Sequence, residues 1–204
     1  MRLAQSSCWL AFILSGEKEI TYPSTQDGYK VAFVGRIECF HKGLDVLMQV
    51  LMLKKWKDRE IIFNLYGNGP HTGMIEDITT NNSIPNLQLK GFSNSVEDVW
   101  NNNHLLILPS RMEGQSLSLI EAMFCERAAV VTNAGGAVEL IEEGLNGFIA
   151  ESATVEALDR ALENAWLERN NWKALGLNAA YTVKLKSPAN PVKYFTDKIL
   201  NVVG

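Results

Sequence analysis

From about Lys30 onward, short apolar runs alternate with segments in which apolar residues recur every three or four positions. The runs have the length of buried strands, and they cover residues 31–34, 61–65, 87–89, 104–108, 128–131 and 148–150. A clear helical stripe follows the first run in a helix expected over Leu44–Trp56, formed by Leu44, Leu47, Met48, Leu51 and Met52. This alternation predicts a doubly wound α/β fold, in which helices cover both faces of one parallel sheet.

Two polar residues mark where later helices should begin. Ser116 precedes a helix that opens at Leu117, and Thr154 precedes a helix that continues to about Glu168. Both residue types are favourable N-caps. A last helical segment is expected from Asn171, with breaks at the prolines of positions 188 and 191.

The amount of apolar sequence suits one domain. The chain has 204 residues, 47% of them hydrophobic, which is enough for one core. We assign residues 30–204 to this domain and regard residues 1–29 as a remnant of a preceding domain or a segment that docks on this one. Cys8–Leu14 has the size of a signal-peptide core, but no A-x-A cleavage site follows it. It is also far shorter than the ~20 apolar residues of a membrane span.

Charge and cysteine content narrow the functional classes. Nineteen Lys and Arg residues against 23 Asp and Glu residues give a net charge of −4, which argues against a nucleic-acid partner. Cys8, Cys39 and Cys125 form no C-x-x-C pair and have no histidine at zinc spacing, so neither a disulfide framework nor a metal site is predicted. We therefore expect a reducing, cytoplasmic location.

The strongest candidate for chemistry is the stretch Glu113–Glu121, which follows the apolar run 104–108 and Pro109. A loop between a parallel strand and a helix exposes backbone N–H groups and the positive end of the helix dipole, which favour a phosphate. The carboxylate of Glu121 could accept hydrogen bonds from a ribose diol, while Glu113 would face a transferred sugar. Two surface glutamates without a functional role often have this spacing by chance, so the interpretation depends on motifs elsewhere in the chain.

Further motifs occur in order between Val31 and Ala180. They are Gly35-Arg36, Lys42-Gly43, Tyr66-Gly67-Asn68-Gly69-Pro70, Lys90-Gly91-Phe92, Pro109-Ser110, the pair Glu113 and Glu121, Asn133-Ala134-Gly135-Gly136 with Glu139, and Glu143-Gly144-Leu145-Asn146-Gly147-Phe148. In this order they resemble the carboxyl-terminal half of the retaining GT-B glycosyltransferases called group 1 or family 4. The resemblance implies a Rossmann-like domain, one half of a GT-B fold, that binds a nucleotide-diphosphate sugar of the UDP or GDP type.

The resemblance also implies roles for individual residues. Arg36 and Lys42 would stabilise charge on the departing phosphate, and with Glu113, which would orient the sugar, they form the expected catalytic set. The donor-binding set comprises these three with Glu121 for the ribose and Gly35, Lys90, Phe92, Gly114, Gln115, Ser116 and Leu117. Two alternatives for Phe92, packing on the base and packing in the core, stay open. No metal and no cofactor is expected, since cations and backbone amides would bind the diphosphate.

The chain departs from the family in two respects. Gln115-Ser116 stands where many members have an aromatic residue and a glycine, and this length has no room for the family's amino-terminal acceptor domain. We therefore expect the donor domain of a glycosyltransferase, inactive alone, that serves polysaccharide or glycoconjugate synthesis by front-face retaining transfer. A non-catalytic nucleotide-binding module and half of a nucleotide-sugar epimerase stay open as alternatives. So does a peripheral contact of the full-length protein with the inner face of the membrane.

Overall fold

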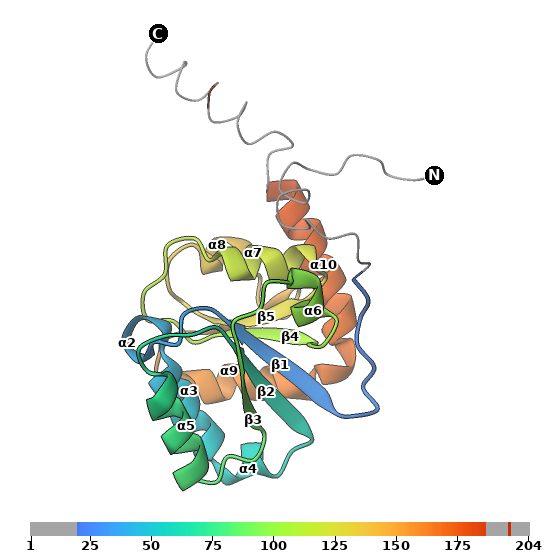
Figure 1. The fold of residues 1–204 in the computed structure, drawn as a ribbon. Coiled ribbons are helices and arrows are strands. Elements are labelled where there is room, and N and C mark those ends of the chain that lie inside the picture. The colour runs from blue at the N-terminus through green and yellow to red at the C-terminus, as the bar shows by residue number, and fades with distance from the viewer. Residues whose placement is uncertain (1–19, 187–195, 197–204) are drawn as a thin grey trace.

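The structure, a computed structural model, describes residues 20–186 and residue 196. Its centre is one six-stranded sheet with the order β3-β2-β1-β4-β5-β6, in which neighbouring strands are parallel (Figure 1). The strands are β1 (Tyr29–Val34), β2 (Ile61–Tyr66), β3 (Leu87–Gly91), β4 (Leu105–Leu108), β5 (Ala128–Thr132) and β6 (Gly147–Ala150). The predicted doubly wound α/β fold is confirmed, and each predicted strand is present within two residues of its expected ends.

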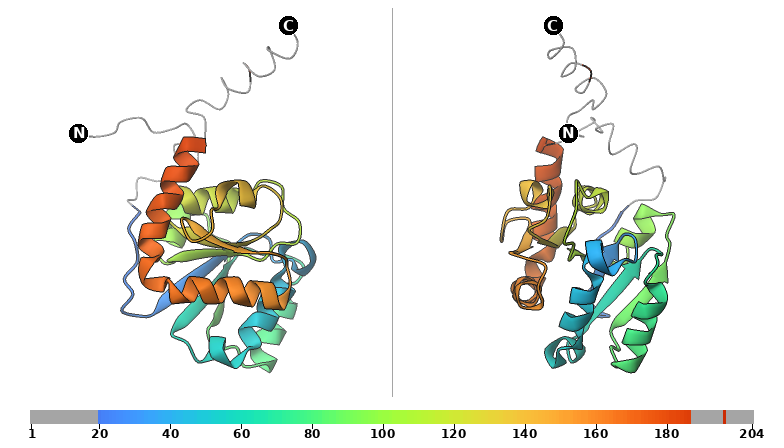
Figure 2. Two further views of the ribbon diagram at one scale, coloured as in Figure 1. Left: turned by 180° about the vertical axis from the view of Figure 1, so that it is seen from behind. Right: turned by 90° about the vertical axis from the view of Figure 1, so that its left-hand side faces the viewer.

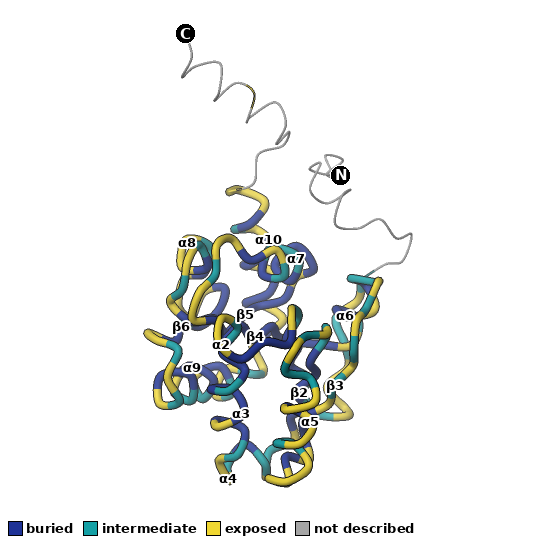
Figure 3. Tube along the Cα trace, turned by 60° about the vertical axis from the view of Figure 1, so that its left-hand side comes forward, coloured by how far each residue is buried: buried dark blue, intermediate teal, exposed yellow. Residues whose placement is uncertain are grey.

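The strands form where apolar residues run together because both faces of the sheet are covered. Every residue of β4 and β5 is buried, and Figure 3 shows these strands enclosed within the fold. β1 and β2 pair along their whole length, from Tyr29 opposite Ile61 to Val34 opposite Tyr66. This register brings the ends of the two strands, and the loops that follow them, to the same edge of the sheet.

Helices pack on both faces of the sheet (Figures 1 and 2). One face carries α3 (Leu44–Met52), α5 (Thr72–Asn81) and α9 (Val155–Leu167), and the other α6 (Val96–Trp100), α7 (Leu117–Phe124) and α10 (Trp172–Lys186). Three shorter helices and one 3₁₀ turn complete the described elements: α2 (Cys39–Lys42), α4 (Lys54–Lys57), α8 (Ala137–Leu140) and η1 (Arg169–Asn171). Right-handed crossovers produce this two-sided arrangement because the chain moves across the sheet in opposite directions before and after β3.

The helix predicted over Leu44–Trp56 is divided in two, which corrects the sequence-based expectation. α3 ends at Met52, Leu53 has an extended backbone (φ −63°, ψ 133°), and α4 begins at the next residue. The apolar stripe continues across the break, so periodicity alone could not reveal it. After the break Trp56 is fully buried, and its indole N–H donates to Oδ1 of Asp159 on α9 at 2.7 Å.

The predicted ends of the later helices agree with the structure. The hydroxyl of Thr154 caps α9 by accepting a hydrogen bond from the N–H of Ala157 at 3.3 Å, and α9 ends at Leu167. α10 begins at Trp172, one residue after the expected start. The expected breaks at positions 188 and 191 lie outside the described residues.

Residues 20–28 lead into β1 without forming a helix or a strand. The N–H of Thr21 donates to Oδ1 of Asn101 at 2.7 Å, and Arg127 donates to the carbonyl of Thr21 at 2.7 Å. The ring of Tyr22 packs edge-on against His104, with 5.4 Å between ring centroids. These contacts fix the described end of the amino-terminal segment to the domain. The rest of that segment, including Cys8–Leu14, lies outside the described residues, so its assignment stays a prediction.

Candidate functional site: a pocket and a charged pair at the carboxyl edge of the sheet

At the carboxyl edge of the sheet, the loops that follow β1 and β4 lead to helices on opposite faces. β1 pairs with β2 on one side and with β4 on the other, and the chain continues from β4 toward β5. Open α/β sheets bind their ligands in the crevice that forms at such a reversal of strand order. Except for Glu143–Phe148, which leads into β6, the motifs singled out in the sequence lie at or after the ends of β1 to β5, so the fold brings them to this one edge.

A pocket of about 440 Å³ lies at this edge, and we call it the β1–α7 pocket. Residues from the ends of β1 and β2, from the loop after β3 and from α6 and α7 line it. Four predicted donor-binding residues meet here, namely Gly35, Arg36, Phe92 and Glu121. They are scattered along the chain, and the sheet brings them together.

Glu121 reaches the pocket from α7 and is partly buried. Burial raises the pKa of its carboxyl group, and no hydrogen-bond donor among the described residues opposes that effect. The carboxylate therefore has acceptor positions that the described protein groups leave unfilled. A ligand with two neighbouring hydroxyl groups could fill them.

Arg36 and Phe92 reach the same pocket from other loops. The Phe92 side chain is 71% exposed, which excludes core packing, one of the two alternatives that the sequence left open. Arg36 is exposed as well. The pocket thus combines an accessible cation, an accessible aromatic ring and a partly buried carboxylate.

Lys42 and Glu113 form a charged pair in a second, more open hollow at the same edge. Nζ of Lys42 lies 2.7 Å from Oε2 of Glu113, and their side chains are 25% and 15% exposed. The hydroxyl of Ser110 donates to the same Glu113 oxygen at 3.1 Å. The hollow measures about 620 Å³ and is also lined by Gly114. Two of the three predicted catalytic residues are therefore in direct contact, while Arg36 lines the β1–α7 pocket.

The first turn of α7 lies between Glu113 and Glu121 in the sequence. Ser116 occupies the N-cap position with an extended backbone, as predicted, but its hydroxyl lies 3.0 Å from that of Ser118 and does not cap the helix. The N–H groups of a first helical turn have no partner within the helix, so here they keep their capacity to donate to an anion. Gly114, Gln115 and Leu117 around them are exposed.

The loop that carries Glu113 is braced by the loop after β5. The N–H of Gly136 donates to the carbonyl of Gly114 at 2.9 Å. Gly135 has a φ of +58°, and a Cβ there would lie 1.7 Å from the carbonyl oxygen of Glu113. Only glycine permits this conformation and this approach together, so the double-glycine motif acts by holding the Glu113 loop.

Sequence reasoning missed Glu38, which lies between Arg36 and Lys42 in the chain. Its carboxylate caps α2 by accepting hydrogen bonds from the N–H groups of Phe40 and His41, each at 2.8 Å. Desolvation acts in the opposite direction, but these bonds and the adjacent His41 ring lower the pKa of Glu38 to about 2. Because glutamate is a less common N-cap than aspartate or serine, the sequence carried little signal for this role.

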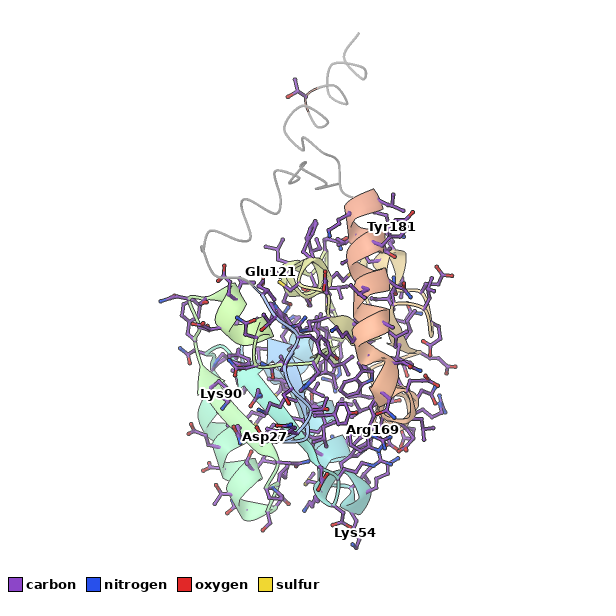
Figure 4. The ribbon with its side chains drawn as sticks, turned by 90° about the vertical axis from the view of Figure 1, so that its right-hand side faces the viewer. Asp27, Lys54, Lys90, Glu121, Arg169 and Tyr181 are labelled. Atoms are coloured by element: carbon purple, nitrogen blue, oxygen red, sulfur yellow. The ribbon has the colours of Figure 1, made fainter. Side chains whose placement is uncertain are left out.

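Three predicted donor-binding residues, Gln115, Ser116 and Leu117, line neither the β1–α7 pocket nor the hollow at Lys42 and Glu113. The same is true of Lys90. It is exposed on β3 and is not among the residues that line the β1–α7 pocket. Figure 4 shows Lys90 and Glu121 on separate elements. The neighbouring Phe92 reaches the pocket because it lies beyond the end of the strand.

Comparison with known proteins now identifies the family. The family described as "Glycosyl transferases group 1" matches residues 28–167, and this chain belongs to it. An uncharacterized glycosyltransferase of Methanocaldococcus jannaschii is 30% identical over 136 residues, which cover 66% of this chain and 37% of that protein. Poly(ribitol-phosphate) alpha-N-acetylglucosaminyltransferase of Staphylococcus aureus is 30% identical over 125 residues, which cover 60% of this chain and 25% of that protein.

Solved structures support the fold. HepE of Anabaena, in complex with UDP, matches with a TM-score of 0.75 at 18% identity, covering 86% of this chain and 49% of that one. The chain therefore spans less than half the length of these three proteins. None of the helices within residues 20–186 combines the length and the apolar character needed to cross a lipid bilayer.

Proposed function

We propose that this chain is the donor-binding domain of a retaining GT-B glycosyltransferase and that it binds a nucleotide-diphosphate sugar of the UDP or GDP type. The observation that carries the proposal is the meeting of Arg36 and Glu121 in one pocket. An arginine suits a diphosphate because of its planar fork of donors, and a carboxylate with unfilled acceptor positions suits a ribose diol. Phe92 offers a ring face for the base. Family membership and the UDP complex of HepE support the same ligand class.

Glu113 would orient the transferred sugar. Lys42 and Ser110 both bind Oε2 of Glu113, which leaves Oε1 to accept hydrogen bonds from sugar hydroxyls. Bond cleavage at the anomeric carbon leaves negative charge on the departing phosphate, and fixed cations and first-turn N–H groups stabilise such charge. Arg36, Lys42 and the start of α7 would supply these groups, so the proposal requires no metal ion and no cofactor.

Transfer would follow a front-face path. The bond between the anomeric carbon and the phosphate oxygen breaks while the acceptor oxygen bonds to the same face of the sugar. The leaving phosphate takes the proton of the acceptor hydroxyl. Because the new bond forms on the face that the phosphate leaves, the anomeric configuration is kept. The acceptor would bind in a second, amino-terminal domain. The name of the S. aureus relative gives poly(ribitol-phosphate) as what that protein acts on, which supports a polymeric acceptor here. The reaction would serve polysaccharide or glycoconjugate synthesis, in the cytoplasm or at the inner face of the membrane.

The test is calorimetric titration of the chain with UDP, GDP and ADP. We expect saturable binding of UDP or GDP. Arg36→Ala and Glu121→Ala should each weaken this binding about ten- to a hundredfold, because each removes a charge-assisted hydrogen bond. Arg160→Ala and Glu76→Ala serve as matched controls, since both residues are exposed and lie outside the pocket. A folded chain that binds none of the three nucleotides would refute the proposal. Nucleotide binding without transfer by a longer protein would indicate a binding module.

A further inference from the structure

Tyr66 carries a hydroxyl group that the proposed function has not yet used. It is the last residue of β2 and lines the pocket near Phe92, Val99 and Trp100. Its hydroxyl oxygen lies 3.0 Å from Nδ2 of Asn103. Asn103 is fully buried, and its Oδ1 accepts a hydrogen bond from Nδ2 of Asn64 at 2.7 Å. The side-chain amides of Asn64 and Asn103 thus form a buried hydrogen-bonded chain that ends at Tyr66, in the wall of the pocket.

The carbonyl of Val99 fixes the orientation of the Asn103 amide. A backbone carbonyl can only accept a hydrogen bond, so the Asn103 atom that lies 2.7 Å from it must be the nitrogen. The same nitrogen faces Tyr66. The tyrosine oxygen must therefore accept in this contact, and its proton points elsewhere.

The Tyr66 proton has no acceptor among the described residues. Oδ1 of Asn64 is buried without any hydrogen-bond partner among the described residues, so it does not accept this proton. Burial raises the pKa of Tyr66, although the bond from Asn103 acts in the opposite direction. The hydroxyl consequently keeps its proton at neutral pH and can donate it to a ligand in the pocket.

We propose that Tyr66 donates this hydrogen bond to a carbonyl oxygen of the nucleotide base and so selects uracil or guanine over adenine. The inference rests on the proposed function. Glu121 in the same pocket accepts hydrogen bonds when ionised, so it suits the ribose hydroxyls, and Tyr66 supplies the opposite polarity for the base. Phe92, Val99 and Trp100 provide apolar walls for a planar ring.

Adenine would fit this arrangement poorly. It carries an amino group where guanine carries its carbonyl oxygen, so the Tyr66 proton would face another donor. A site whose polar group loses its partner discriminates strongly against the wrong ligand. Tyr66 is therefore a specificity-determining residue, and its effect should depend on the base.

The experiment compares Tyr66→Phe with the unchanged chain by calorimetry with UDP, GDP and ADP. The substitution keeps the ring and removes only the hydroxyl. We expect UDP or GDP, whichever binds more tightly, to lose about three- to tenfold in affinity, the usual effect of one neutral hydrogen bond. ADP should bind more weakly from the outset and should not change. Tyr181→Phe is the matched control because that tyrosine is 66% exposed on α10.

Each other outcome has a defined meaning. An equal loss for all three nucleotides would indicate a structural role or a ribose contact, and unchanged affinities, or tightest binding of ADP, would also overturn the proposal. Absence of binding by the unchanged chain would instead refute the proposed function. If Tyr66→Phe does not fold, the unchanged chain is titrated with thio-substituted base analogues of the preferred nucleotide. Because sulfur accepts hydrogen bonds weakly, weaker binding is expected, and equal binding would overturn the inference.

Discussion

At the scale of one residue, the carboxylate of Glu121 favours ligand binding but lowers the stability of the domain. Its carboxylate is partly buried, and no described residue donates a hydrogen bond to it. Such a group lowers the stability of the fold, because the charged form loses hydration without gaining a partner. A ligand that supplies hydroxyl donors would remove this cost on binding.

Replacing Glu121 with Gln should therefore raise stability and lower affinity. The pKa of Glu121 is higher in the folded chain, so the folded state holds the proton more tightly than the unfolded state, and stability falls as pH rises from the unfolded pKa through the raised one. At neutral pH the variant should melt at a higher temperature and bind nucleotide about ten- to a hundredfold more weakly. The two melting temperatures should converge as pH falls through the raised pKa. Thermal unfolding over a pH series checks this. A lower melting temperature of the variant at neutral pH would contradict it.

The sequence could predict the positions of some site residues but not their contacts. Gly35, Arg36 and Phe92 follow strands that the apolar runs mark clearly, so the parallel sheet alone brings their loops to one edge. The ion pair of Lys42 with Glu113 joins residues far apart in the chain, and the pattern of apolar residues does not indicate it. Lys90 lies outside the pocket and Tyr66 lines it. Both positions depend on where β3 and β2 end, and ends of strands are poorly defined by sequence.

At the scale of elements, two loops that approach each other closely hold the Glu113 segment. Gly135→Ala should disturb this arrangement, because Gly135 has a φ of +58° and a Cβ would overlap the carbonyl of Glu113. We expect a loss of stability of about 1–3 kcal/mol, the usual cost of a strained backbone position. Binding of the nucleotide sugar should weaken more than binding of the free nucleotide, since Glu113 would face the sugar in the proposed function.

Gly73→Ala is the matched control. Gly73 lies in α5, has a negative φ, and has open space where an added Cβ would lie, with no other atom within 4 Å. This substitution should leave binding unchanged and stabilise the chain by about 0.5–1 kcal/mol. Equal binding of both ligands by Gly135→Ala and the unchanged chain would show that the two loops do not depend on each other.

The elements differ in how well the sequence predicts them. Buried parallel strands consist almost wholly of apolar residues, which is why the six apolar runs match the six strands. α5 buries only Ile75 fully, so its stripe is too weak to be recognised. The break at Leu53 was missed for the opposite reason, because the stripe that buries α3 continues to the buried Trp56 of α4.

At the scale of the whole molecule, Arg127 joins segments that are distant in sequence. Its side chain is 1% exposed, and its guanidinium donates to the carbonyls of Thr21, Trp100, Asn103 and Cys125. Arg127→Met should destabilise the chain by about 3–5 kcal/mol, because buried carbonyls lose their donors. Urea unfolding should show a lower midpoint with an unchanged slope. Arg160→Met, at a side chain 65% exposed, should change stability by less than about 0.5 kcal/mol. A similar midpoint for both variants would contradict this role for Arg127.

The proposed function divides glycosyl transfer between this domain, which would bind the donor, and an amino-terminal domain, which would bind the acceptor. A protein in which this chain follows an amino-terminal acceptor domain should transfer the sugar with retention of anomeric configuration, whereas the chain alone should only bind the donor. Transfer should persist in excess EDTA, because Arg36, Lys42 and the first turn of α7 would neutralise the leaving diphosphate without a metal ion. Arg36→Ala should lower transfer about a hundredfold, the usual effect of losing one group that stabilises transition-state charge. NMR of the product measures the configuration, and rates with and without EDTA measure the metal dependence. Loss of transfer in EDTA that magnesium restores would assign the charge neutralisation to a metal ion. An inverted product would exclude front-face attack and require a general base that deprotonates the acceptor from the opposite face.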